Sequence, residues 1–204
     1  MSAVATSDAM PDATPDADPD MAPGSRHIAR WIAGGLLMVL IAVSIFLATR
    51  PSYQATEVAS PLLGQQAPDF TQTTLQGPTL SLAELKGHYV YVNFFASWCT
   101  PCQKEEPNLV AFNEEQLQHP GGSALVSVVY DDPDAAAAQF VANSNARWPA
   151  LEDPGGAIAN RYGVSSPPTT FLIDPRGRVV AEFVGPVTKS QLDGALALAR
   201  SHGG

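Results

Sequence analysis

One long apolar run and several shorter ones determine how this chain is organised. Residues 31–49 are predominantly apolar and carry no charge, and a run of this length can cross the hydrocarbon core of a membrane as a helix. Residues 90–95 are β-branched, aromatic or otherwise apolar except at one position, which is typical of a strand buried on both faces. Residues 123–130 show a similar pattern. The chain is therefore expected to contain one membrane-spanning helix followed by a sheet.

Helical periodicity alternates with these strands in the second half of the chain. A helix is expected from about residue 100 to about residue 118, because its apolar residues recur at helical spacing. The side chains expected on its buried face are Leu109, Val110, Phe112 and Leu117. Shorter helices are expected at 134–143, 157–162 and 190–199.

A hairpin is predicted near the end of the chain. Residues 169–173 and 178–184 have strand composition and flank the turn Asp174-Pro175-Arg176-Gly177. Strands that alternate with helices and end in a hairpin indicate an α/β domain, in which helices flank a mixed central sheet.

Two polar segments carry signals for helix starts. Ser81 and Glu84 have the spacing of a capping box, and the short helix that they begin is expected to stop at Gly87. Asp131, Asp132 and Asp134 lie at the start of the helix at 134–143, where acidic side chains complement the helix dipole. This reading is preferred to a calcium loop, because adjacent carboxylates alone do not make one.

The N-terminal region predicts a membrane anchor with flanking polar segments. Residues 1–29 are rich in Ala, Pro and Asp and are expected to be a disordered acidic cytoplasmic tail. Residues 30–50 are the predicted anchor, 51–61 a linker and 62–204 an extracytoplasmic domain. Two arginines precede the apolar run and one follows it, which favours a cytoplasmic N-terminus.

A cleaved signal peptide is the alternative interpretation of the same run. Its basic and apolar regions would suit that role. However, the run is longer than a usual signal-peptide core, and Leu47-Ala48-Thr49-Arg50 makes a poor cleavage site. An uncleaved, single-pass anchor is therefore expected.

Composition restricts the function further. The formal net charge is −9, and an excess of acidic residues argues against a nucleic-acid surface. The chain has only two cysteines, Cys99 and Cys102, and they lie three residues apart where the strand at 90–95 gives way to a helix. Backbone N–H groups at the start of that helix would point at the Cys99 sulfur and stabilise a thiolate. Cys99 is the expected nucleophile and Cys102 the resolving thiol in disulfide exchange.

Other uses of a Cys-x-x-Cys pair are less well supported. A zinc site needs two further ligands, no second cysteine pair exists, and the histidines have no ligand spacing. These are His27, His88, His119 and His202. Covalent haem attachment needs a histidine directly after Cys102, where Gln103 stands. A purely structural disulfide across so short a loop would stabilise little.

The string Asn93-Phe94-Phe95-Ala96-Ser97-Trp98-Cys99-Thr100-Pro101-Cys102, followed by Glu105 and Pro107, resembles the active site of one branch of the thioredoxin superfamily. That branch is the membrane-anchored TlpA/ResA/CcmG (DsbE) family of thiol-disulfide oxidoreductases. The resemblance extends from about Leu62 to about Leu198. It implies a thioredoxin fold with a βα insertion, preceded by a single transmembrane helix.

The resemblance also implies which residues assist Cys99 and Cys102. Trp98 would shield the sulfurs and contact partners, Pro101 occupies the first helical turn, and Glu105 would serve as acid or base for Cys102. Pro168, within Val164-Ser165-Ser166-Pro167-Pro168-Thr169, corresponds to the family's cis-proline.

The neighbours of Pro168 are the expected substrate contacts. Pro167 and Thr169 flank it. Pro167 has no N–H to pair with a substrate main chain, which departs from the family pattern. Asn93 stands where cytoplasmic thioredoxins carry a buried aspartate, so that aspartate's proton relay is absent.

The function expected from this resemblance is reduction of protein disulfides at the outer face of a bacterial cell membrane, with no metal or organic cofactor. Electrons would come from a membrane thiol transporter of the DsbD/CcdA type. Apocytochrome c is a plausible substrate.

A thiol oxidant or isomerase is the nearest alternative. A peroxiredoxin-like peroxidase is disfavoured because Ala96 stands where its motif has Thr or Ser. A metal or haem chaperone is a further alternative, but copper-binding relatives space their cysteines more widely.

Overall fold

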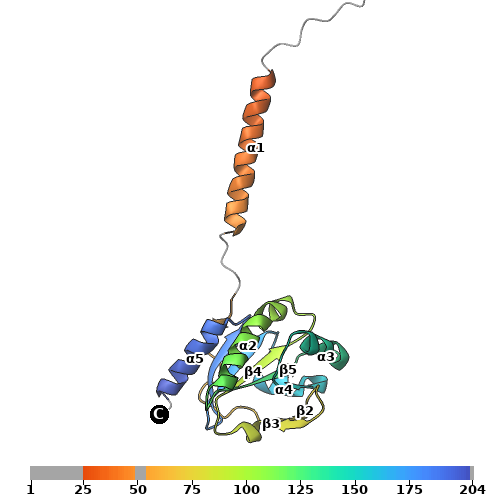
Figure 1. Ribbon diagram of the computed structural model, residues 1–204, viewed down its shortest axis with the longest axis vertical. Helices are drawn as coiled ribbons and strands as arrows, with labels where there is room; N and C mark the ends of the chain where they lie inside the picture. The colour runs from red at the N-terminus through yellow and green to blue at the C-terminus, as the bar shows by residue number, and fades with distance from the viewer. Residues whose placement is uncertain (1–24, 49–53, 203–204) are drawn as a thin grey trace, which may run out of the picture. The chain divides into compact units, whose positions relative to one another are not determined.

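The computed structural model describes residues 25–48 and 54–202. The chain divides into two compact units, Met1–Pro51 and Ser52–Gly204. The first contains helix α1 (Ser25–Ala48) and the second contains the sheet with its covering helices (Figure 1). Most of the predicted tail lies outside the described residues, but residues 25–29 belong to α1.

Helix α1 has the length and composition of a membrane span. Within the described residues it is the one helix that passes this test, over Arg30–Ala48. Its apolar side chains are exposed all around the helix, as expected where lipid rather than protein is their solvent.

The second unit is built on a mixed six-stranded sheet in the order β1-β8-β7-β4-β5-β6. Strands β4, β5 and β6 are parallel to one another, and the other neighbours in the sheet are antiparallel. The strands are β1 (Thr56–Glu57), β4 (Val90–Phe95), β5 (Ala124–Val129), β6 (Ala150–Leu151), β7 (Thr169–Ile173) and β8 (Val179–Val184). This is the thioredoxin-like α/β architecture that the sequence predicts.

Successive side chains of the fully buried strand β4 point to opposite faces of the sheet, into two apolar layers. Tyr91 packs with Phe112 of α2 and Leu192 of α5, and Phe95 packs with Phe140 of α3. On the other side, Val92 and Phe94 pack with α4 and the 3-10 helix η1. The helices are α2 (Thr100–Gln118), α3 (Asp134–Asn143), α4 (Ala157–Tyr162), α5 (Lys189–His202), η1 (Leu82–Leu85) and η2 (Pro154–Gly156).

A small hairpin and η1 complete the second layer. Strands β2 (Thr71–Thr73) and β3 (Thr79–Ser81) pair antiparallel. Ser81 then caps η1: its Oγ accepts from the Ala83 N–H, and Glu84 Oε1 accepts from the Ser81 N–H. The capping box is thus present, although the turn that it begins is a 3-10 helix.

Two sequence expectations need correction. Leu117 is exposed, whereas the expected Leu109 and Phe112 are buried together with Asn113 and Gln116, because these four residues follow the helical repeat. Part of the expected linker at 51–61 belongs to the sheet: β1 pairs with β8, and the Ala55 N–H donates to the Pro186 carbonyl. The backbone groups at the edge of β8 find partners there.

Candidate functional site

The two cysteines lie at the carboxyl end of the central strand β4, where α2 begins. Cys99 and Cys102 form a disulfide with an S–S distance of 2.08 Å. Both residues are buried, with exposed fractions of 3% and 1%, beside Phe95, Ala96 and Val129. The pair therefore sits at the buried start of α2, directly after the central strand.

The first turn of α2 directs one backbone N–H at a cysteine sulfur. Cys99 is the N-cap residue, and its Sγ accepts a hydrogen bond of 3.1 Å from the Cys102 N–H. Pro101 occupies the first turn, where its missing N–H costs no hydrogen bond. The backbone thus provides the donor that would stabilise a Cys99 thiolate once the disulfide opens.

The turn before Cys99 is held by the loop that follows β5. The Ser97 N–H donates to Asp132 Oδ2 at 2.6 Å, and Trp98 Nε1 donates to the Asp131 carbonyl at 3.0 Å. Trp98 itself remains 56% exposed, so its ring is open to a partner.

The structure divides the roles of these aspartates: Asp134 lies in the first turn of α3, as expected, whereas Asp131 and Asp132 contact the active-site turn. Pro133 is the N-cap of α3, and no side chain caps that helix. Asp132 binds the active-site turn instead, and Asp131 adopts a left-handed backbone with φ of 44°. Only the pairing of β4 with β5 brings this loop to the cysteines, and no local motif signals it.

Glu105 is the buried acid of the site. It lies one turn after Cys102 on α2 and is 1% exposed. Its Oε1 accepts from Asn93 Nδ2 at 2.9 Å, and its Oε2 accepts from the Val187 N–H at 2.9 Å. Asn93 also donates to Thr170 Oγ1 at 3.0 Å. Asn93 therefore fixes the carboxyl group but does not titrate.

Burial changes the acidity of Glu105. Loss of solvation raises the pKa of this carboxyl to about 8, although the Val187 and Asn93 hydrogen bonds act in the opposite direction. The nearby Glu106 raises the pKa further. A carboxyl group with such a pKa can hold or release a proton near neutral pH.

The Pro167–Pro168 peptide bond is cis, as the resemblance implied for Pro168. Pro168 is buried and Pro167 is half-buried. Thr169 is 3% exposed, and its Oγ1 donates to the Ser166 carbonyl. The structure therefore places Thr169 at the buried start of β7, where its side chain holds the preceding turn.

The segment after β8 connects this loop to the buried acid. The Gly185 N–H donates to the Pro168 carbonyl at 2.9 Å, and Val187 binds Glu105 two residues later. Nothing in the sequence indicates this role for Val187, because the contact spans 82 residues and uses only its backbone.

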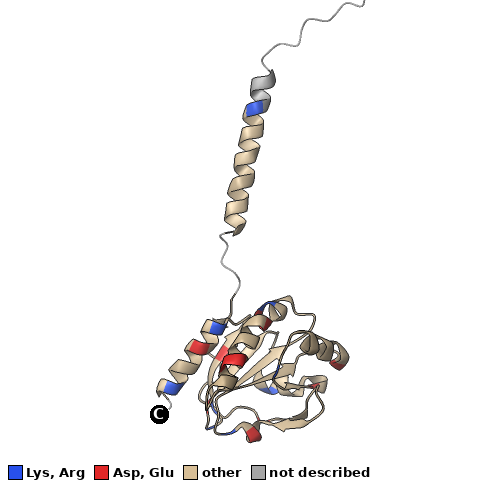
Figure 2. Ribbon diagram, in the orientation of Figure 1, with Lys and Arg blue, Asp and Glu red and all other residues tan. Residues whose placement is uncertain are grey.

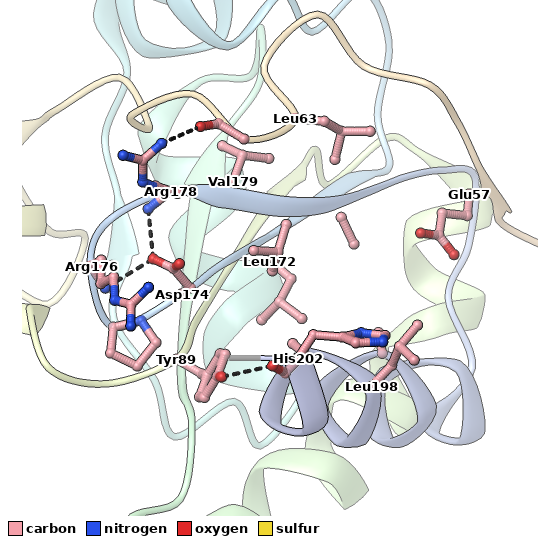
Figure 3. Close-up of a pocket in the computed structure, with 16 residues that line it drawn as sticks. Glu57, Leu63, Tyr89, Leu172, Asp174, Arg176, Arg178, Val179, Leu198 and His202 are labelled. Atoms are coloured by element: carbon pink, nitrogen blue, oxygen red, sulfur yellow. Dashed lines mark hydrogen bonds between the residues drawn. The ribbon is translucent and has the colours of Figure 1, made fainter. Parts of the chain in front are cut away.

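Other parts of the described structure show no second reactive centre. Among the described residues, no group of three His, Cys, Asp or Glu side chains is placed to hold a metal ion. A hollow of about 470 Å³ lies near the opposite end of the sheet, lined in part by Tyr89 and Arg178 (Figure 3). Tyr89 donates to the Ala199 carbonyl, and Arg178 donates to the Gly64 carbonyl and to Asp174. These groups hold the surrounding segments together.

Comparisons with known proteins agree with this geometry. A model of the AhpC/TSA family matches residues 63–182. The thiol-disulfide oxidoreductase ResA of Bacillus thuringiensis (strain Al Hakam) is 37% identical over 134 residues, which cover 66% of this chain and 76% of the relative. The thioredoxin-like protein YneN of Bacillus subtilis is 34% identical over 172 residues, which cover 83% of this chain and 98% of the relative. A crystal structure described as thiol:disulfide interchange protein DsbE from Chlorobium tepidum matches with a TM-score of 0.58 at 33% identity. The match covers 66% of this chain and 94% of the solved chain.

The fold and the cysteine pair define a thioredoxin-like thiol-disulfide oxidoreductase. The chain belongs to the AhpC/TSA family of thioredoxin-like proteins, within the TlpA/ResA/CcmG (DsbE) group that its motifs resemble.

Proposed function

We propose that this enzyme reduces disulfides in protein substrates outside the cytoplasm. The arrangement around the cysteines carries the proposal, and it has two parts: an N–H at the start of α2 points at the Cys99 sulfur, and a buried carboxyl group with a raised pKa lies one turn beyond Cys102. The first favours the attacking thiolate. The second can exchange a proton with the resolving thiol.

The reaction proceeds in two exchanges that conserve electrons. The Cys99 thiolate attacks one sulfur of the substrate disulfide, and the other substrate sulfur leaves as a thiolate and takes up a proton. Cys102 loses its proton and attacks the Cys99 sulfur, which releases the second substrate thiol. The substrate gains two electrons and the enzyme keeps the Cys99–Cys102 disulfide. Because the two thiols carry both electrons, the step needs no metal or organic cofactor.

Glu105 is the group that we assign to proton exchange with Cys102. Its two oxygens accept hydrogen bonds from the fixed donors Asn93 and Val187. The carboxyl group is therefore held in place while its protonation changes. Trp98, which directly precedes Cys99, and the Pro168 loop, which leads into the neighbour strand of β4, are the proposed contacts for the substrate.

The cellular setting follows from the apolar helix. We place α1 across a bacterial cell membrane as a single, uncleaved anchor, with the N-terminus in the cytoplasm and the enzyme domain outside. A membrane thiol transporter of the DsbD/CcdA type would return electrons to Cys99 and Cys102. Apocytochrome c is the proposed substrate. The ResA and DsbE relatives support the class of enzyme.

The equilibrium potential of the Cys99–Cys102 couple tests the direction of electron flow. The whole chain in detergent would be equilibrated with thiol–disulfide buffers, and the reduced fraction measured by alkylation. A value near that of thioredoxin, about −270 mV, is expected for a reductase. A value near about −120 mV would contradict the proposal and indicate an oxidant of folding proteins.

A further inference from the structure

A groove between α2 and α3 has no role in the chemistry described above. It encloses about 450 Å³. One wall is a stripe along α2 that includes Gln103, Glu106, Val110 and Glu114, whose spacing of three or four residues places them on one face. Phe140 of α3 contributes to the opposite wall. Both apolar and acidic side chains therefore border the groove.

This groove begins at the active site. Gln103 directly follows Cys102, and its Nε2 donates to the Ser97 carbonyl at 2.8 Å. Phe140 stacks on Phe95 with 5.6 Å between the ring centroids, and it packs against the apolar cluster that contains both cysteines. Glu106 lies about 6 Å along the helix axis from Cys102, and Glu114 about 18 Å.

The charge of the groove is negative and unbalanced. In the part of the chain that the structure describes, no Lys, Arg or His lines it, and neither Glu106 nor Glu114 forms an ion pair. Acidic positions are marked on α2 in Figure 2. Burial raises the pKa of Glu106, and a hydrogen bond with Ser144 offsets part of that effect. A cation that entered the groove would meet a carboxylate with reduced access to water.

We propose that this groove binds a lysine or arginine side chain of the disulfide-bearing substrate, next to the disulfide under attack. The inference rests on the reductase function proposed above and names a property of its substrate. The apolar walls, which include Val110 and Phe140, can cover the aliphatic stem, while the carboxylates pair with the charged end. An extended chain rises about 3.3 Å per residue, so the basic residue lies about two to six positions from the substrate cysteine.

Matched peptides test the proposal. Two synthetic peptides would carry one disulfide each and differ only in having lysine or glutamine about two to six positions before and after each cysteine. Stopped-flow fluorescence of Trp98 would give the rate constant for reduction of each peptide by the reduced whole chain in detergent. The lysine peptide should react about five-fold faster, and added salt should reduce this advantage.

Variants on α2 distinguish the groove from the general acidity of the protein. The double substitution Glu106→Gln with Glu114→Gln should make the rate constants for the lysine peptide and the glutamine peptide nearly equal. Glu115→Gln is the matched control, because Glu115 does not line the groove and pairs with Lys189. Glu115→Gln should leave the ratio of the two rate constants unchanged. Equal rates for the two peptides with the unmodified chain, or equal losses in both variants, would overturn the proposal.

A binding measurement separates this inference from the reductase function. Versions of both peptides with serine in place of cysteine would be titrated against the oxidised protein by fluorescence anisotropy. Tighter binding of the lysine version, lost in the double variant, supports the groove even if neither disulfide peptide is reduced. Reduction of both disulfide peptides with no preference in rate or binding would support the reductase and reject the groove.

Discussion

At the scale of single residues, Glu105 makes folding sensitive to pH. Its pKa in the folded protein is about 8, above its ordinary value of 4.5, so the folded state keeps a proton that the unfolded chain releases over this interval. The free energy of unfolding of the oxidised protein should therefore fall as the pH rises from about 4.5 to about 8. The fall attributable to Glu105 is at most roughly 5 kcal/mol.

The substitution Glu105→Gln isolates this effect. Glutamine does not titrate, so the variant should lose that part of the pH dependence. It should also carry a constant cost of about 1–3 kcal/mol, because one carbonyl oxygen cannot accept from both Asn93 and Val187. Urea unfolding at several pH values, with the disulfide intact, measures both quantities. Parallel pH profiles for the two proteins would show that Glu105 does not have the raised pKa.

Pro167 should limit main-chain pairing with the substrate. It lies directly before Pro168 and offers a carbonyl but no N–H. The substitution Pro167→Thr restores a donor at this position, and we expect reduction of a panel of unrelated peptide disulfides to become about two- to five-fold faster. Pro175→Thr, in the distant turn between β7 and β8, is the control. If Pro167→Thr left every peptide unaffected, this position would not pair with substrates.

At the scale of elements, the loop between β5 and α3 positions the active-site turn. Asp132→Ala removes the acceptor of the Ser97 N–H, and a hydrogen bond to a charged group contributes about 1.5–3 kcal/mol. We expect a comparable loss of stability, slower disulfide exchange and greater quenching of Trp98 fluorescence by acrylamide. Asp132→Asn should retain much of the bond through its amide oxygen.

Asp134→Ala serves as the control for that loop. Asp134 lies in the first turn of α3 and forms no cap there, so its removal should leave the exchange rate close to that of the unmodified protein. An equal slowing by Asp134→Ala and Asp132→Ala would mean that local negative charge matters, and not the bond to Ser97.

Elements with a strong local pattern were predictable from the sequence, whereas contacts between distant segments were not. The apolar run of β4 and the Cys-x-x-Cys pair indicated the central strand, the start of α2 and the position of the site. The prediction put Leu117 on the buried face of α2 because its side chain is apolar, although its position does not follow the helical repeat. Gln116 is buried there instead, and its Oε1 accepts a hydrogen bond from the Ser123 N–H. The Val187 and Asp132 contacts depend on how the strands pair, which local composition does not encode.

At the scale of the whole molecule, the second unit should fold without the first. Ser52–Gly204 has its own sheet and apolar layers, so a chain lacking residues 1–51 should unfold cooperatively and remain monomeric.

A chain lacking residues 1–58 loses β1 and leaves the edge of β8 unpaired. Its melting temperature should be lower by about 3–8 °C, and it should self-associate through the open edge. Calorimetry and light scattering measure both, and identical behaviour of the two chains would show that β1 contributes nothing.

The way Ala55 joins the sheet also has a mechanical consequence. Ala55 donates to the Pro186 carbonyl and accepts from Gln191 of α5, and Pro186 directly precedes the residue whose N–H binds Glu105. A pulling force applied through the preceding chain would therefore load these two hydrogen bonds. Such a force would act on Pro186, one residue away from the Val187 amide that holds the buried Glu105.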